Sequence, residues 1–139
     1  MTPPPVDVTL AVVASERELI ATIRFTNKST GPAFVDRIKG CVSGELEADV
    51  FVILPTDAPK AQPLAYVGLR GKRRKPLLQD FVRLEPGASF ESKVRVDKTY
   101  AFPVGHRDYK VTYTALHQFP QNDDYWEVSS NDVMVGFPK

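Results

Sequence analysis

The sequence has few of the residues on which enzyme active sites and disulfide frameworks depend. Its 139 residues include one cysteine and two histidines. A single cysteine excludes an internal disulfide. No His-Glu-x-x-His motif, no Gly-x-Ser-x-Gly motif and no glycine-rich phosphate loop occurs. The sequence therefore predicts a protein that is not an enzyme and that needs no metal or other cofactor.

Long apolar runs and an excess of charge of one sign are also missing. No segment approaches the ~20 apolar residues of a membrane helix, so we expect no membrane insertion. Lys and Arg number 18 and Asp and Glu 17, which leaves a net charge of +1 and no overall field to attract nucleic acid. Residues 1–5 lack the basic and apolar regions of a signal peptide. The protein is then either cytoplasmic or a domain whose leader is missing from this sequence.

Alternation of apolar and polar residues is the feature that the chain does have. It is clearest between Phe90 and Val96 and between Tyr109 and Ala115, and it is typical of half-buried antiparallel strands. Further strand-like segments lie at 6–12, 19–26, 34–35, 50–54, 64–69, 81–84 and 126–137. We therefore predict an all-β protein, a single immunoglobulin-like antiparallel β-sandwich of about seven or eight strands. The domain would span residues 6–138, after a proline-rich lead-in at 1–5.

A set of large apolar residues on these segments is predicted to form one core between two sheets. The set comprises Phe25, Phe51, Ile53, Phe81, Val94, Val96, Val111 and Tyr113. In addition, Tyr109 or Tyr113 is expected to donate a hydrogen bond back to a preceding turn, as in the tyrosine corner of immunoglobulin-like domains.

The least ordinary stretch is the basic run, residues 70–75, which contains Arg70, Lys72, Arg73, Arg74 and Lys75. Five cations cannot sit in a core, and Gly71 and Pro76 mark a loop. The run could be a solvated hairpin tip, a nucleic-acid contact, or a loop that presents cations to an acidic pocket of another protein. Nucleic acid is the weakest of the three, because no aromatic residue is interleaved and the other residues carry 13 cations (18 minus 5) against 17 anions. We expect no nucleic-acid partner.

The histidines and the cysteine have ordinary interpretations. His106, in His106-Arg107-Asp108, and His117 could bring two imidazoles and a carboxylate to one edge, but their spacing does not force them to converge on a metal. We predict turn and surface histidines. Cys41 is expected to be a small buried hydrophobe. The alternative, a thiolate donated to a partner's metal, requires an exposed thiol with a lowered pKa.

Several short motifs follow one another in the second half of the chain. They are Tyr66-Val67-Gly68, the basic run, Asp80-Phe81-Val82-x-Leu84-x-Pro86-Gly87-x-Ser89, Tyr100-x-Phe102, Tyr109-x-Val111-x-Tyr113 and Ser130-Asn131-x-Val133-x-Val135. In these motifs, over about residues 60–137, the chain resembles the non-catalytic β-sandwich domain that precedes the zinc-protease domain of peptidyl-lysine (deuterolysin-type, aspzincin) metallopeptidases. That family's zinc-binding helix has no counterpart in this sequence, so no catalytic residue is carried over.

The resemblance implies a relative of a pro-domain, which in the family assists folding and keeps the protease inactive. It implies a zinc metallopeptidase as partner, with Tyr66 and the five cations of the basic run as partner-binding residues, and it favours a periplasmic or secreted location. The predicted function is a protein-binding module that inhibits or chaperones a lysine-specific zinc metallopeptidase, as a detached pro-domain or an immunity-type inhibitor. The alternative is a structural or adhesion-type sandwich of an envelope or secretion assembly, without a protease partner.

Overall fold

The computed structural model describes residues 5–57, 60–69, 77–118 and 125–139. Across these ranges the chain is all-β, as predicted, with nine strands, one short 3-10 turn and no α-helix. The elements are β1 (Val6–Ala14), β2 (Leu19–Asn27), β3 (Ala33–Asp36), β4 (Phe51–Pro55), η1 (Leu78–Asp80), β5 (Phe81–Leu84), β6 (Ser89–Arg95), β7 (Arg107–Gln118), β8 (Tyr125–Ser129) and β9 (Val133–Phe137). No helix in the described ranges is long and apolar enough to cross a membrane.

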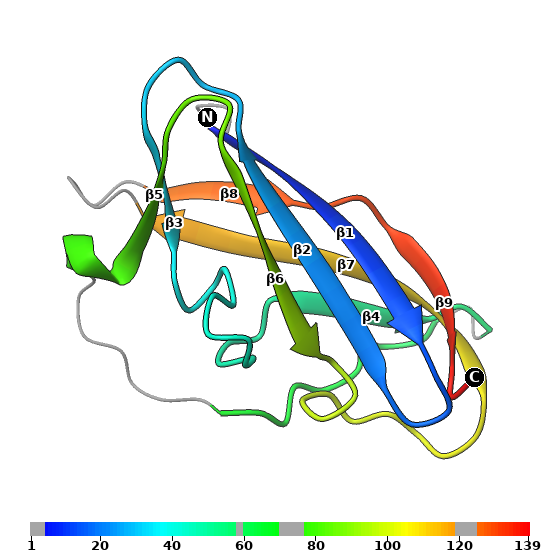
Figure 1. Cartoon of the computed structure of the whole chain (residues 1–139). Coiled ribbons are helices and arrows are strands. Elements are labelled where there is room, and N and C mark those ends of the chain that lie inside the picture. The colour runs from blue at the N-terminus through cyan, green and yellow to red at the C-terminus, as the bar shows by residue number, and fades with distance from the viewer. Residues whose placement is uncertain (1–4, 58–59, 70–76, 119–124) are drawn as a thin grey trace.

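The strands form antiparallel sheets that pack face to face. One sheet has the order β1-β2-β6, and in the other β4 lies on one side of β7 while β8 and β9 share its other side. Figure 1 shows the first sheet lying across the second, with the β3-β5 pair beside one end. Strands β1, β2 and β6 thus face strands β4, β7 and β9. Immunoglobulin-type sandwiches have the same arrangement, with strands A, B and E in one sheet and C, F and G in the other. The predicted fold class is confirmed.

The core follows from the alternation in the sequence. All eight residues predicted to form it are buried, and all except Phe81 belong to one core cluster. Tyr113 lies at its centre, with its ring edge-to-face against Phe25 of the facing sheet (5.7 Å between centroids) and against Phe51 of the neighbouring strand (5.8 Å). Phe51 in turn contacts Tyr100, and Tyr100 contacts Tyr66 at 5.4 Å. A continuous series of aromatic contacts therefore links the core to the turn that begins at Tyr66.

One side-chain amide joins the two sheets at their edge. Asn131 lies between β8 and β9, and its Oδ1 accepts a hydrogen bond from the Leu10 amide of β1 at 2.8 Å. Its Nδ2 donates to the Leu10 carbonyl at 3.0 Å. The amide thus satisfies both backbone groups of an edge-strand residue, which would otherwise be open to pairing with another chain.

One detail of the predicted strands was wrong. Residues 64–69 form no strand, because the chain turns at Gly68; their one β-bridge joins Tyr66 to Tyr100. The segment 126–137 contains two strands separated by residues 130–132, next to the turn predicted at 129–131. β8 then pairs with the second half of β7 and β9 with the first half.

Candidate functional site

Of the residues predicted to bind a partner, Tyr66 is the one that the structure describes. The five cations of the basic run lie outside the described residues. Tyr66 is buried, and its hydroxyl donates a hydrogen bond to the Leu69 carbonyl at 2.8 Å. A Cβ added at Gly68 would come within 2.6 Å of that hydroxyl, so only glycine lets the turn close over the ring. The turn holds Leu69 in place directly before the basic run.

A pocket of about 470 Å³ opens beside this turn. Three segments line it, namely residues 44–46, residues 67–69 and residues 95–99, the last through Arg95, Lys98 and Thr99. The Val67 amide donates to the Thr99 carbonyl at 2.8 Å, which ties two of the three walls together. Leu46, Val67 and Leu69 supply apolar surface, while Arg95, Lys98 and Glu45 bring charge to the rim. The volume lies within the range of about 300–1,000 Å³ that is usual for ligand-binding pockets.

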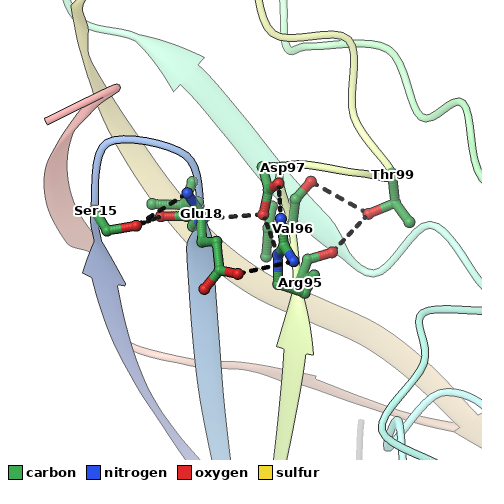
Figure 2. Close-up of polar contacts among 7 residues, drawn as sticks. Ser15, Glu18, Arg95, Val96, Asp97 and Thr99 are labelled. Carbon is green, nitrogen blue, oxygen red and sulfur yellow. Dashed lines mark hydrogen bonds and ion pairs between the residues drawn. The ribbon is translucent and has the colours of Figure 1, made fainter.

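Figure 2 shows a network of ion pairs and hydrogen bonds, which we call the hairpin cluster (Ser15, Glu18, Arg95 and Asp97). One of its members, Arg95, lines the pocket. The Arg95 guanidinium donates two hydrogen bonds to the Asp97 carboxylate, at 2.9 and 2.7 Å, and lies 3.1 Å from a Glu18 carboxylate oxygen. Asp97 also accepts the Leu19 amide proton at 2.9 Å. The cluster therefore ties the β1-β2 hairpin to the end of β6, with a bidentate pair at its centre.

Asp97 and Arg95 are committed to each other electrostatically. Burial alone would raise the pKa of Asp97, but the hydrogen bonds from Arg95 and from the Leu19 amide outweigh it and hold the pKa below its ordinary value. Two carboxylates already neutralise Arg95. Lys98 is exposed and forms no ion pair with any described residue. Among the described residues of the pocket rim, Lys98 is thus the cation without an ion-pair partner.

Exposed aliphatic residues lie at both ends of the basic run. Val67 and Leu69, just before it, are 60% and 69% exposed, and Leu77 and Leu78, just after it, are 52% and 62% exposed. The second pair is held in place because the Leu77 amide donates to the Asp80 carboxylate at 2.7 Å and the Asp80 amide to the Leu77 carbonyl at 2.8 Å. Four exposed aliphatic side chains therefore flank the basic run in the sequence.

A second polar network, the β7 cluster (Asp36, Lys39, Tyr113 and His117), lies inside the protein. The Tyr113 hydroxyl donates to the Lys39 carbonyl at 2.6 Å, in the turn after β3. The predicted hydrogen bond to an earlier turn is therefore present, but it is not that of a tyrosine corner, whose acceptor lies only a few residues upstream. The Tyr113 oxygen and His117 Nε2 lie 3.1 Å apart. Because the hydroxyl proton is already donated to Lys39, the imidazole Nε2 donates the hydrogen bond to the Tyr113 oxygen. His117 Nδ1 accepts the Asp36 amide proton at 3.2 Å. Each hydroxyl or ring nitrogen in the series has a partner.

The prediction of two surface histidines was wrong for His117. It is fully buried and stacked on Trp126, with ring centroids 4.4 Å apart. β7 runs to Gln118 instead of ending near Ala115, so the inward alternation of 109, 111 and 113 reaches 117. This continued alternation is the signal that would have found it. His106 is exposed, as predicted.

The two histidines lie at opposite ends of β7, on the order of 35 Å apart at strand rise, so they do not meet. No group of three or more His, Cys, Asp or Glu residues that could hold a metal ion occurs among the described residues. Cys41 is buried, and desolvation raises the pKa of its thiol to about 12. Both conditions for a thiolate ligand, exposure and a lowered pKa, are therefore unmet, and the buried-hydrophobe interpretation holds.

The chain matches no protein-family model, and no curated protein matches it.

Proposed function

We propose that this chain is a non-catalytic protein-binding module whose binding surface is the basic run with the aliphatic residues on either side of it. The observation that carries the proposal is the exposure of Val67, Leu69, Leu77 and Leu78 at the two ends of the run. The partner proposed is a lysine-specific zinc metallopeptidase, which the module inhibits or helps to fold. This choice of partner rests on the resemblance of residues 60–137 to the family's pro-domain.

The mixture of side chains favours a protein partner over the other two interpretations of the run. A loop that served only to keep a hairpin tip solvated would gain nothing from exposed aliphatic residues at both of its ends. Stacking on single-stranded nucleic acid uses aromatic side chains, whereas Val67, Leu69, Leu77 and Leu78 are aliphatic. Exposed apolar residues contribute to protein interfaces, and arginine is enriched there.

The proposed partner also matches the charge of the run. A peptidase that cleaves beside lysine holds that side chain in an acidic pocket, because a buried ammonium needs a paired charge. A lysine or arginine of the run could occupy the same pocket and block it. Apolar neighbours already held in position reduce the ordering cost of binding. The Leu69 carbonyl is held by the Tyr66 hydroxyl and the Leu77 amide by the Asp80 carboxylate.

The test is inhibition of the lysine-specific zinc metallopeptidase encoded by the same organism. The wild type is compared with a variant in which Lys72, Arg73, Arg74 and Lys75 are all changed to Ala. If a cation of the run is a buried anchor, we expect the variant to lose about 2–5 kcal/mol of binding free energy, mainly through faster dissociation. The loss should persist at high salt, since buried pairs are screened little.

The matched control removes the same charge elsewhere, by changing four exposed cations to Ala: Arg17, Lys28, Lys60 and Lys139. We expect this control to inhibit as the wild type does once salt screens its effect on association. Equal potency of wild type, variant and control at both low and high salt would show that the run is only solvated. Absence of inhibition by the wild type would rule out the peptidase as the inhibited partner.

A further inference from the structure

We propose that the pocket between residues 44–46, 67–69 and 95–99 binds an apolar side chain of a protein partner, about the size of leucine, while the carboxylate of the partner's adjacent acidic residue pairs with Lys98. The inference rests on the proposed function, because it specifies the partner's chemistry at one part of the binding surface. It concerns described residues only and requires nothing of the basic run.

The apolar part of the pocket is built from residues with different degrees of burial. Leu46 is buried and forms the base, whereas Val67 and Leu69 are 60% and 69% exposed. Covering these last two side chains would remove apolar surface from water, a gain of roughly 25 cal/mol per Å². The pocket therefore gains most from a ligand that is itself apolar.

The walls are held in place before any ligand arrives. Tyr66 fixes the turn at 67–69 through its hydrogen bond to Leu69, and the Val67 amide bonds to Thr99 on the next wall. On the third wall, the Gly44 amide donates to the Cys41 carbonyl at 3.0 Å. A pocket with preformed walls does not lose affinity to the ordering of its own segments.

The charges at the rim determine which residue is favoured beside the apolar residue of the partner. Among the described lining residues, Arg95 and Lys98 are cations and Glu45 is the single anion. Because Asp97 and Glu18 neutralise Arg95, Lys98 is the cation able to bind an incoming carboxylate. Such an exposed pair is worth little in free energy but sets preference between ligands that are otherwise alike.

The test titrates the ¹⁵N-labelled full chain with four capped dipeptides, followed by amide chemical shifts. The probes are acetyl-Leu-Glu-amide, acetyl-Leu-Gln-amide, acetyl-Ala-Glu-amide and acetyl-Leu-Lys-amide. We expect shifts at Leu46, Gly68 and Thr99. Acetyl-Leu-Glu-amide should bind about two- to fivefold more tightly than acetyl-Leu-Gln-amide at low salt, the size of an exposed ion pair. The alanine probe should bind more weakly than either.

Two pairs of variants localise the effect. Lys98→Gln should abolish the preference for Glu over Gln, whereas Lys28→Gln, at an exposed lysine that does not line the pocket, should keep it. Val67→Glu should abolish binding of all leucine probes, whereas Val13→Glu, at a position 70% exposed on β1, should not. All four sites are exposed, so the variants are expected to fold, which the same spectra report.

Several results would overturn the proposal. They are the absence of shifts at the pocket with every probe, tighter binding of acetyl-Leu-Lys-amide than of acetyl-Leu-Glu-amide, and a preference for Glu that survives in Lys98→Gln. None of these uses a partner protein. A negative result here therefore leaves the peptidase-inhibition experiment to decide the proposed function separately.

Discussion

The hairpin cluster and the β7 cluster are both hydrogen-bonded polar networks, and they differ in what surrounds them. In the β7 cluster, His117 and Tyr113 are fully buried, and they bond to each other and to the backbone at Asp36 and Lys39. In the hairpin cluster, the Arg95 side chain is 34% exposed and faces a pocket. A fixed hydrogen-bond network fills the first site, while the second stands beside open volume and an uncommitted lysine.

The difference shows where this fold can carry function. A buried polar group must be hydrogen-bonded within the protein, so its partners stabilise the fold and are no longer available to a ligand. Residues at the end of a sandwich keep one side in water and can bind a partner without leaving a buried group unpaired. Binding surfaces are for this reason more often found on loops that a rigid scaffold holds in place.

Of the substitutions that test this comparison, His117→Ala in the β7 cluster is expected to lower the unfolding free energy most. The substitution removes a ring stacked on Trp126, takes the acceptor from the Asp36 amide and leaves the Tyr113 hydroxyl with the Lys39 carbonyl as its one remaining partner. We expect a loss of about 3–5 kcal/mol in unfolding free energy, from a cavity and buried unpaired groups. Urea unfolding measures it. His106→Ala, at the exposed histidine, is the control and should change stability by less than about 0.5 kcal/mol. Similar values for both variants would contradict the structural role of His117.

The hairpin cluster is tested by Asp97→Asn, which removes a charge but keeps nearly the same shape. We expect a loss of about 1.5–3 kcal/mol near neutral pH, typical of a hydrogen bond to a charged group. Because the pKa of Asp97 is lowered in the folded state, its contribution is present above the ordinary value of 3.8 and is lost as pH falls through the folded pKa. The stability difference between wild type and variant should therefore shrink below that pH. A difference that is constant down to acid conditions would show that charge is not its source.

The smallest effects should come from two tyrosines four residues apart on β7. The Tyr113 hydroxyl has two partners, whereas the Tyr109 hydroxyl is buried and has none. Tyr113→Phe should cost about 1–2 kcal/mol, because it leaves the Lys39 carbonyl and the imidazole unsatisfied. Tyr109→Phe should leave stability unchanged or raise it by up to about 1 kcal/mol, since it removes an unpaired buried hydroxyl. Thermal and urea unfolding of both variants provide the measurement, and an equal loss in both would refute the comparison.

The sequence alone was sufficient for the fold class and the core, since the period of two residues fixes which side chains of a strand share a face. Residues as far apart as Phe25 and Tyr113 were predicted to be buried together, and their rings do meet. The same rule failed at His117 because the strand was ended too early. Because histidine is polar, the alternation of inward-facing residues was not recognised as continuing to position 117.

The candidate site could be predicted only in part. The basic run and Tyr66 were found from composition and resemblance, but the pocket was not, because its walls come from residues 44–46, 67–69 and 95–99. The pairing of Asn131 with Leu10, 121 residues away, is of the same kind. Alternation is a local property that determined which faces are buried. Which segments meet at the end of the sandwich depends on long-range strand pairing, and only the tertiary structure decided that.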